Sequence, residues 1–160
     1  MVNIDSKIDF CNKEQEALSV LGKPKIIQIY NDLRKNNNIC ACCGFKPNVL
    51  QNLKLHIIDY FENNANACLL CEACFLIKHF DKALEQKCVA LANSEYTQIS
   101  LMEIQRKSNK TTNQEILKKR IVVLKETAED YATKIKSDNL LYSPYIKVLF
   151  NNNFKWNNCK

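Results

Sequence analysis

The apolar positions of residues 12–36 recur at helical spacing and predict two consecutive helices. Asn12 is a suitable N-cap for the first helix, which should run to Leu21 with Gly22 just past its end. Pro24 opens the second helix, because the first turn tolerates the missing N–H of proline. Its predicted buried face consists of Ile26, Ile27, Tyr30 and Leu33.

The middle of the chain changes to a loose alternation of apolar and polar residues, which predicts a β-hairpin between residues 39 and 68. A polar loop over residues 62–66 divides it. A helix over residues 75–85 and a short strand over residues 88–91 should follow. The alternating apolar residues are Val49, Leu53, Leu55, Ile57 and Tyr60.

The C-terminal half reads mainly as helix. Ser94 or Thr97 should cap a helix that ends near Arg106, and Pro144 should open a short last helix. A long helix over residues 112–136 is predicted between them, and we expect its stripe to pack on the domain's own core. The stripe consists of Leu117, Ile121, Leu124, Ala128, Tyr131 and Ile135.

Together these elements predict a mainly helical α+β fold in a single domain over residues 1–153, followed by a flexible tail over residues 154–160. No apolar run approaches the roughly 20 residues of a membrane helix. Residues 1–10 mix charged with apolar side chains, unlike a signal peptide. We therefore expect a cytoplasmic protein without direct membrane insertion.

The net charge of +6 is weak evidence for a nucleic-acid partner. Only Arg34, Arg106 and Arg120 of the 23 basic residues are arginines, and arginine supplies the planar fork that phosphate and guanine recognition favours. A zinc-bearing nucleic-acid-binding protein is accordingly the least favoured interpretation.

Six of the nine cysteines lie between residues 40 and 74, which indicates a metal site in a reducing compartment. Cys40 and Cys43 form a C-x-x-C-G turn that presents two thiolates to one ion. A second C-x-x-C turn would complete the tetrahedral four-sulfur coordination that structural Zn²⁺ prefers. The sequence therefore predicts one structural zinc.

Two pairs are candidates for the second half of the zinc site. Cys71 and Cys74 are favoured because Leu69–Leu70 should be a strand that leads into the turn, and Cys68 with Cys71 is the alternative. Cys42 should point away from the ion. We assign no function to the isolated thiols Cys11, Cys88 and Cys159.

The order C-x-x-C-G, Leu-x-Leu-His-Ile and Leu-Leu-C-x-x-C followed by a helix resembles the zinc-bound HNH nuclease fold, with the ββα module at about residues 38–86. The resemblance implies that His56 stands where the general base lies and that His79 is a surviving metal ligand. Leu55 and Phe75 occupy positions where metal ligands are expected, so we expect the nuclease activity to be lost. The alternative is a metal-dependent nuclease built on His56 and His79, with help from Asp59 or Asp81.

The strings Cys40–Phe45 and Ala67–Phe75 are more narrowly similar to the DotN/IcmJ family of type IVB secretion systems, over roughly residues 25–150. That resemblance implies a non-catalytic, zinc-stabilised adaptor. Its partners would be the C-terminal tail of the DotL-like coupling ATPase, DotM and the IcmS–IcmW chaperones. Such an adaptor would be cytoplasmic and peripheral at the inner membrane through its complex.

Overall fold

The structure is a computed structural model that describes residues 4–49, 52–107, 121–137 and 145–156. The chain divides into two compact units. The first is built from residues up to Phe80, and the second from Asp81–Trp156. Within the described residues there are six helices and two small antiparallel sheets, so the predicted α+β class is confirmed.

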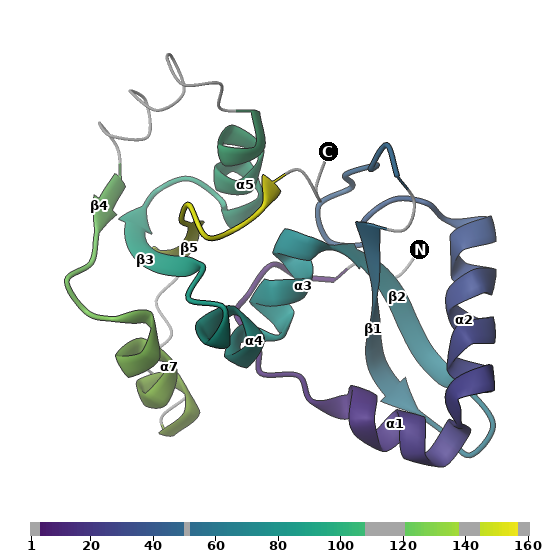
Figure 1. The fold of residues 1–160 in the computed structure, drawn as a ribbon. Coiled ribbons are helices and arrows are strands. Elements are labelled where there is room, and N and C mark those ends of the chain that lie inside the picture. The colour runs from purple at the N-terminus through teal and green to yellow at the C-terminus, as the bar shows by residue number, and fades with distance from the viewer. Residues whose placement is uncertain (1–3, 50–51, 108–120, 138–144, 157–160) are drawn as a thin grey trace. The chain divides into compact units, whose positions relative to one another are not determined.

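The first unit consists of two helices, a hairpin and a third helix (Figure 1). Both predicted N-terminal helices are confirmed, and Gly22 between them has a φ of 79° that only glycine adopts freely. The prediction of a buried face on the second helix is wrong, since none of its residues is buried. The elements are α1 (Lys13–Leu21), α2 (Lys23–Asn36), β1 (Leu53–Tyr60), β2 (Ala65–Cys71) and α3 (Glu72–Lys78).

The predicted hairpin is confirmed, with β1 and β2 antiparallel from the pair Leu53–Cys71 to the pair Tyr60–Ala65. The register shifts between Ile57 and Asp59, which is the mark of a bulge. Apolar side chains from the hairpin and α3 form the core, and each buried leucine or isoleucine contributes about 1.5–3 kcal/mol. The fully buried ones include Leu53, Ile57, Leu70, Leu76 and Ile77.

The segment before α1 is hydrogen-bonded along the end of α3. The N–H of Asp9 donates to the carbonyl of Ile77 at 3.0 Å, and the N–H of Cys11 donates to that of Lys78 at 3.0 Å. The buried ammonium of Lys78 also donates to Asp5 Oδ1 at 2.5 Å. This segment therefore brings residues from the start of the chain beside His79, where the predicted helix 75–85 breaks into α3 and α4 (Phe80–Glu85).

In its described residues, the second unit has a three-stranded antiparallel sheet and the helices α5 and α7, and all but the first residue of α4 also belongs to it. Thr97 Oγ1 accepts the Ser100 N–H at 3.1 Å, so the predicted cap of the helix ending near Arg106 is confirmed. The strand order is β4-β3-β5. The elements are β3 (Val89–Ser94), α5 (Gln98–Lys107), β4 (Ile121–Val123), α7 (Ala128–Ser137) and β5 (Ile146–Phe150).

Two glutamine side chains of α5 pair with the backbone of β5. The Gln98 amide donates to the Val148 carbonyl at 2.8 Å and accepts the Val148 N–H at 2.8 Å. Gln105 makes the same two bonds with Phe150, at 2.8 and 3.1 Å. These side chains satisfy strand groups that would otherwise be unpaired, because a buried N–H or C=O without a partner is costly.

Two predictions about the C-terminal half are corrected. The prediction of one helix over residues 112–136 is wrong at residues 121–127, where β4 and a short irregular stretch precede α7. The part of that prediction before residue 121 lies outside the described residues. The short helix after Pro144 is instead β5, in which Val148 and Phe150 are buried at period two. The fold is for this reason less helical than expected.

The end of the described chain is packed. Phe154 is buried, and its ring centroid lies 4.4 Å from that of Phe150 and 4.7 Å from that of Trp156. Residues 157–160 of the predicted tail lie outside the described residues. None of the helices in the described ranges is both long and apolar enough to cross a bilayer.

Candidate metal centre

The first half of the centre is a tight turn between α2 and β1. The Gly44 N–H donates to the Cys40 carbonyl at 2.9 Å, and Gly44 has a φ of 73° that permits this closure. The N–H of Ala41 donates to the carbonyl of Leu69 at 2.9 Å, which holds the turn against β2. The C-x-x-C-G string thus folds as a loop that carries Cys40 and Cys43 to the end of the hairpin.

The second half is the junction of β2 and α3. Cys71 is the last residue of β2 and the N-cap residue of α3, and Cys74 lies in the first turn of that helix. Residues three apart share one face of a helix. The strand that ends at Cys71 and the helix that begins there therefore direct both sulfurs to the same side.

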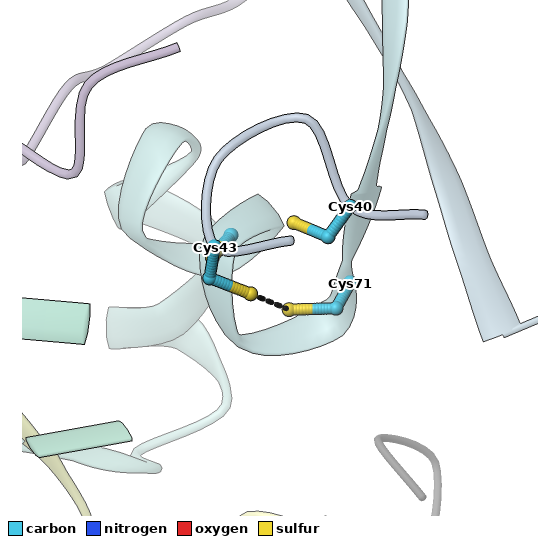
Figure 2. A group of neighbouring side chains, drawn as sticks. Cys40, Cys43 and Cys71 are labelled. Atoms are coloured by element: carbon cyan, nitrogen blue, oxygen red, sulfur yellow. Dashed lines mark hydrogen bonds between the residues drawn. The ribbon is translucent and has the colours of Figure 1, made fainter. Parts of the chain in front are cut away.

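The four sulfurs of Cys40, Cys43, Cys71 and Cys74 lie within 4.8 Å of one another. Figure 2 shows the sulfurs of Cys40, Cys43 and Cys71 directed toward one another, with 3.8 Å between those of Cys43 and Cys71. A tetrahedral ion with zinc–sulfur bonds of about 2.3 Å separates its sulfurs by about 3.8 Å. The donor set and its spacing therefore fit one zinc ion.

The sulfurs cannot all ionise without a cation. Hydrogen bonding to Cys43 raises the pKa of Cys40, and hydrogen bonding to Cys40 lowers the pKa of Cys43. Hydrogen bonding to Cys40 and the other thiols, together with burial, raises the pKa of Cys74. Hydrogen bonding within the cluster thus favours ionisation of one sulfur over the others, and a divalent ion would be needed to stabilise four neighbouring thiolates.

The two other cysteines nearby lie outside this group. Cys42 is not one of the four converging sulfurs, and its Sγ donates to the Asp5 carbonyl at 3.6 Å, although it also interacts with the Cys74 thiol. Cys68 is buried in β2 opposite His56, and burial raises its pKa to about 12. The structure thus gathers the favoured pair Cys71 and Cys74 rather than Cys68 with Cys71.

The two histidines carried over from the nuclease resemblance meet in the first unit. His56 Nδ1 lies 3.0 Å from His79 Nε2, and both side chains are buried. Phe75, which stands at a ligand position of the nucleases, stacks on the His79 ring with centroids 4.0 Å apart. Burial lowers the pKa of His56, so this imidazole is neutral at pH 7.

Neither carboxylate considered for a nuclease site joins the histidines. The Asp59 carboxylate accepts the Tyr60 N–H at 2.9 Å, and that of Asp81 is bound to Lys136 at 2.7 Å in the second unit. The side chains that do approach are Cys11 and Glu14, to which the sequence interpretation gave no role. Their C-x-x-E spacing at a helix start was the only signal, and it is a weak one.

Comparison with family models, curated proteins and solved structures finds none that matches the chain.

Proposed function

We propose that this protein is a zinc-stabilised, non-catalytic adaptor of a type IVB secretion coupling complex, and that it binds the C-terminal tail of the coupling ATPase. The observation that supports a structural metal is the convergence of the four sulfurs of Cys40, Cys43, Cys71 and Cys74. The secretion-system assignment itself depends on the DotN/IcmJ resemblance of the two cysteine strings.

A zinc held by these four residues would have a structural role. Four protein ligands complete a tetrahedral shell and leave no position for water or substrate. Cys40, Cys71 and Cys74 are each only 1% exposed, and Cys43 is the one partly exposed ligand. The binding free energy of the ion would instead stabilise the contact between the turn and the β2–α3 junction.

The face of α2 supports a role in binding a partner. Ile26, Ile27 and Tyr30 line a groove of about 360 Å³ together with Leu53, Lys54 and Leu55 of β1. Ile27 is 47% exposed, which is high for an isoleucine on an apolar stripe. Lys23, Lys25, Arg34 and Lys35 of α2 outnumber its single acid, Asp32. The expected occupant is an apolar tail segment of the ATPase that also carries acidic residues.

The proposal is tested by purifying the tagged protein from its own bacterium and identifying the copurifying proteins by mass spectrometry. We expect a large coupling ATPase together with small chaperone-like subunits. Ile27→Asp should abolish this recovery, whereas Val20→Asp on α1, where Val20 is similarly exposed at 50%, should not. Recovery of nucleic acid, or of no secretion component, would contradict the adaptor function.

A metal-dependent nuclease is the second candidate, and the contact between His56 and His79 is the observation that favours it. Supercoiled plasmid incubated with Mg²⁺, Mn²⁺ or Ni²⁺ tests this candidate directly. The adaptor proposal predicts no nicking. Nicking that disappears in His56→Ala would replace the adaptor with the nuclease.

A further inference from the structure

A second group of metal-ligating side chains lies in the first unit, apart from the four cysteines already described. It consists of Cys11, Glu14, His56 and His79, whose donor atoms lie within 4.8 Å of one another. His56 lies on β1, His79 follows α3, and Glu14 lies in the first turn of α1. Cys11 and Glu14 precede the part of the chain that resembles the DotN/IcmJ family.

The hydrogen bonds of His79 direct one ring nitrogen into this group. Its Nδ1 lies 3.1 Å from the carbonyl oxygen of Cys11, so Nδ1 carries a proton and donates it. In the neutral ring, Nε2 then has a lone pair, and this atom faces His56 Nδ1 at 3.0 Å. A backbone carbonyl on the other nitrogen is the usual partner that orients a metal-binding histidine.

Glu14 gives the second observation. Its Oε1 atom is buried and accepts no hydrogen bond within the described part of the chain, although it lies 3.0 Å from His79 Nε2. His79 Nε2 meets hydrogen-bond geometry toward His56 Nδ1 and not toward Glu14 Oε1. A buried carboxylate oxygen without a donor is costly, and a cation among these atoms would satisfy it.

We propose that Cys11, Glu14, His56 and His79 bind a second zinc ion. Two imidazole nitrogens, one thiolate and one carboxylate form a mixed donor set that suits Zn²⁺, and the two anionic ligands balance its charge. The Cys11 thiol, which donates to the Ile57 carbonyl at 3.6 Å, releases its proton to solvent on binding. Ring nitrogens on a tetrahedral zinc lie about 3.3 Å apart, so the two histidines would separate by about 0.3 Å.

This ion would fasten the N-terminal segment to the hairpin. Cys11 and Glu14 come from residues 11–14 near the start of the chain, whereas His56 comes from the hairpin and His79 from the end of α3. The Cys11 N–H already donates to the Lys78 carbonyl between these parts. All four ligands belong to the protein, so the site is closed and structural. It is independent of the adaptor proposal, because the two ligand sets share no residue.

The test is the zinc content of the full chain, measured by mass spectrometry after dialysis against a buffer of fixed free Zn²⁺. We expect two zinc ions per chain in the wild type and one in the double variant Cys11→Ser/His79→Gln. Glu14→Gln should weaken binding of the second ion by at least 10-fold in a chelator competition. Glu16→Gln is the matched control on the same helix, where Glu16 accepts a hydrogen bond from Tyr60 instead.

Each outcome separates this inference from the four-cysteine site. One zinc per wild-type chain that is retained in Cys11→Ser/His79→Gln and lost in Cys74→Ser would overturn the second site alone. One zinc that is lost in Cys11→Ser/His79→Gln would keep the second site and overturn the first. Two zinc ions that both persist in the double variant would also contradict the inference. If that variant fails to fold, the zinc affinities of Glu14→Gln and Glu16→Gln decide. Glu14→Gln should still fold, because Glu14 is 27% exposed and glutamine has the same shape as glutamate.

Discussion

The two units of the chain stabilise themselves by different means. The first unit buries sulfur and imidazole groups of the kind that bind metals, in two clusters beside its hairpin. In the described part of the second unit, no such cluster is found. Its sheet is stabilised by apolar side chains and by the amides of Gln98 and Gln105, which pair with the backbone of β5. Cys88 there donates to the Ala83 carbonyl at 3.6 Å.

This difference implies that metal should control the stability of one unit and not of the other. A small core gains most from a metal, and the first unit has a two-stranded sheet and a helix, α2, with no buried residue. Trp156 is the chain's single tryptophan and packs edge-on against Phe150 with centroids 5.5 Å apart. Its fluorescence therefore reports on the packing of the second unit.

Loss of a zinc ligand should have the largest effect. Cys40→Ser or Cys74→Ser should abolish tight zinc binding, for which structural sites contribute about 10 kcal/mol, and unfold the first unit. Circular dichroism and zinc analysis measure this loss, while the Trp156 emission should stay native. Cys42→Ser is the matched control, since Cys42 is buried beside Cys40 but lies outside the cluster. A Cys40 variant with normal zinc content and melting temperature would contradict the account.

Truncation of Phe154 should produce the opposite pattern. Phe154→Ala removes a buried ring in contact with Phe150 and Trp156, at a cost of about 3–5 kcal/mol. Trp156 emission should shift to the red at lower urea concentration, while the zinc content stays unchanged. Tyr145→Ala is the control, because Tyr145 is 57% exposed. Loss of zinc in the Phe154 variant would show that the two units are not independent.

Removal of one strand-pairing amide should cost less. Gln98→Ala leaves the N–H and the carbonyl of Val148 without their side-chain partner, which should lower the free energy of unfolding of the second unit by about 2 kcal/mol. Urea titration followed by Trp156 fluorescence measures it. The exposed Gln86 provides a control substitution to alanine, for which we expect less than about 0.5 kcal/mol. Equal effects of the two substitutions would contradict the role given to Gln98.

The smallest effect on stability is expected at the groove. Ile27→Asp should change the free energy of unfolding by less than about 0.5 kcal/mol, because almost half of the Ile27 surface is already exposed. The same variant should nevertheless lose the ATPase partner. A large drop in its urea midpoint would show that Ile27 belongs to the core and not to a binding surface.

The sequence predicted the elements whose signals are local. The caps Gly22 and Thr97 and the alternation in β1 each act through neighbouring residues, and the structure has a helix or strand at each. The C-x-x-C spacing likewise required only short turns. In β5, by contrast, the apolar run of Val148, Leu149 and Phe150 is too short to fix a period, and the pairing with β3 decides for a strand.

The parts that were missed depend on contacts between distant residues. Cys11 lies 45 residues from His56 in sequence, and the hydrogen bonds of residues 9–11 to the end of α3 bring it near His79. Ile121 and Leu124 fit a helical stripe, yet the Leu124 N–H bonds to the Leu91 carbonyl at 2.9 Å beside the sheet. No local pattern contains that information.

Hydrogen exchange of the full chain, with and without a strong zinc chelator, tests the central claim that metal sustains the first unit alone. The account predicts that chelation removes amide protection from β1, β2 and α3 and leaves that of β3 and β5 unchanged. Protection that persists in the hairpin after the zinc has left, or that is lost equally from both sheets, would contradict it.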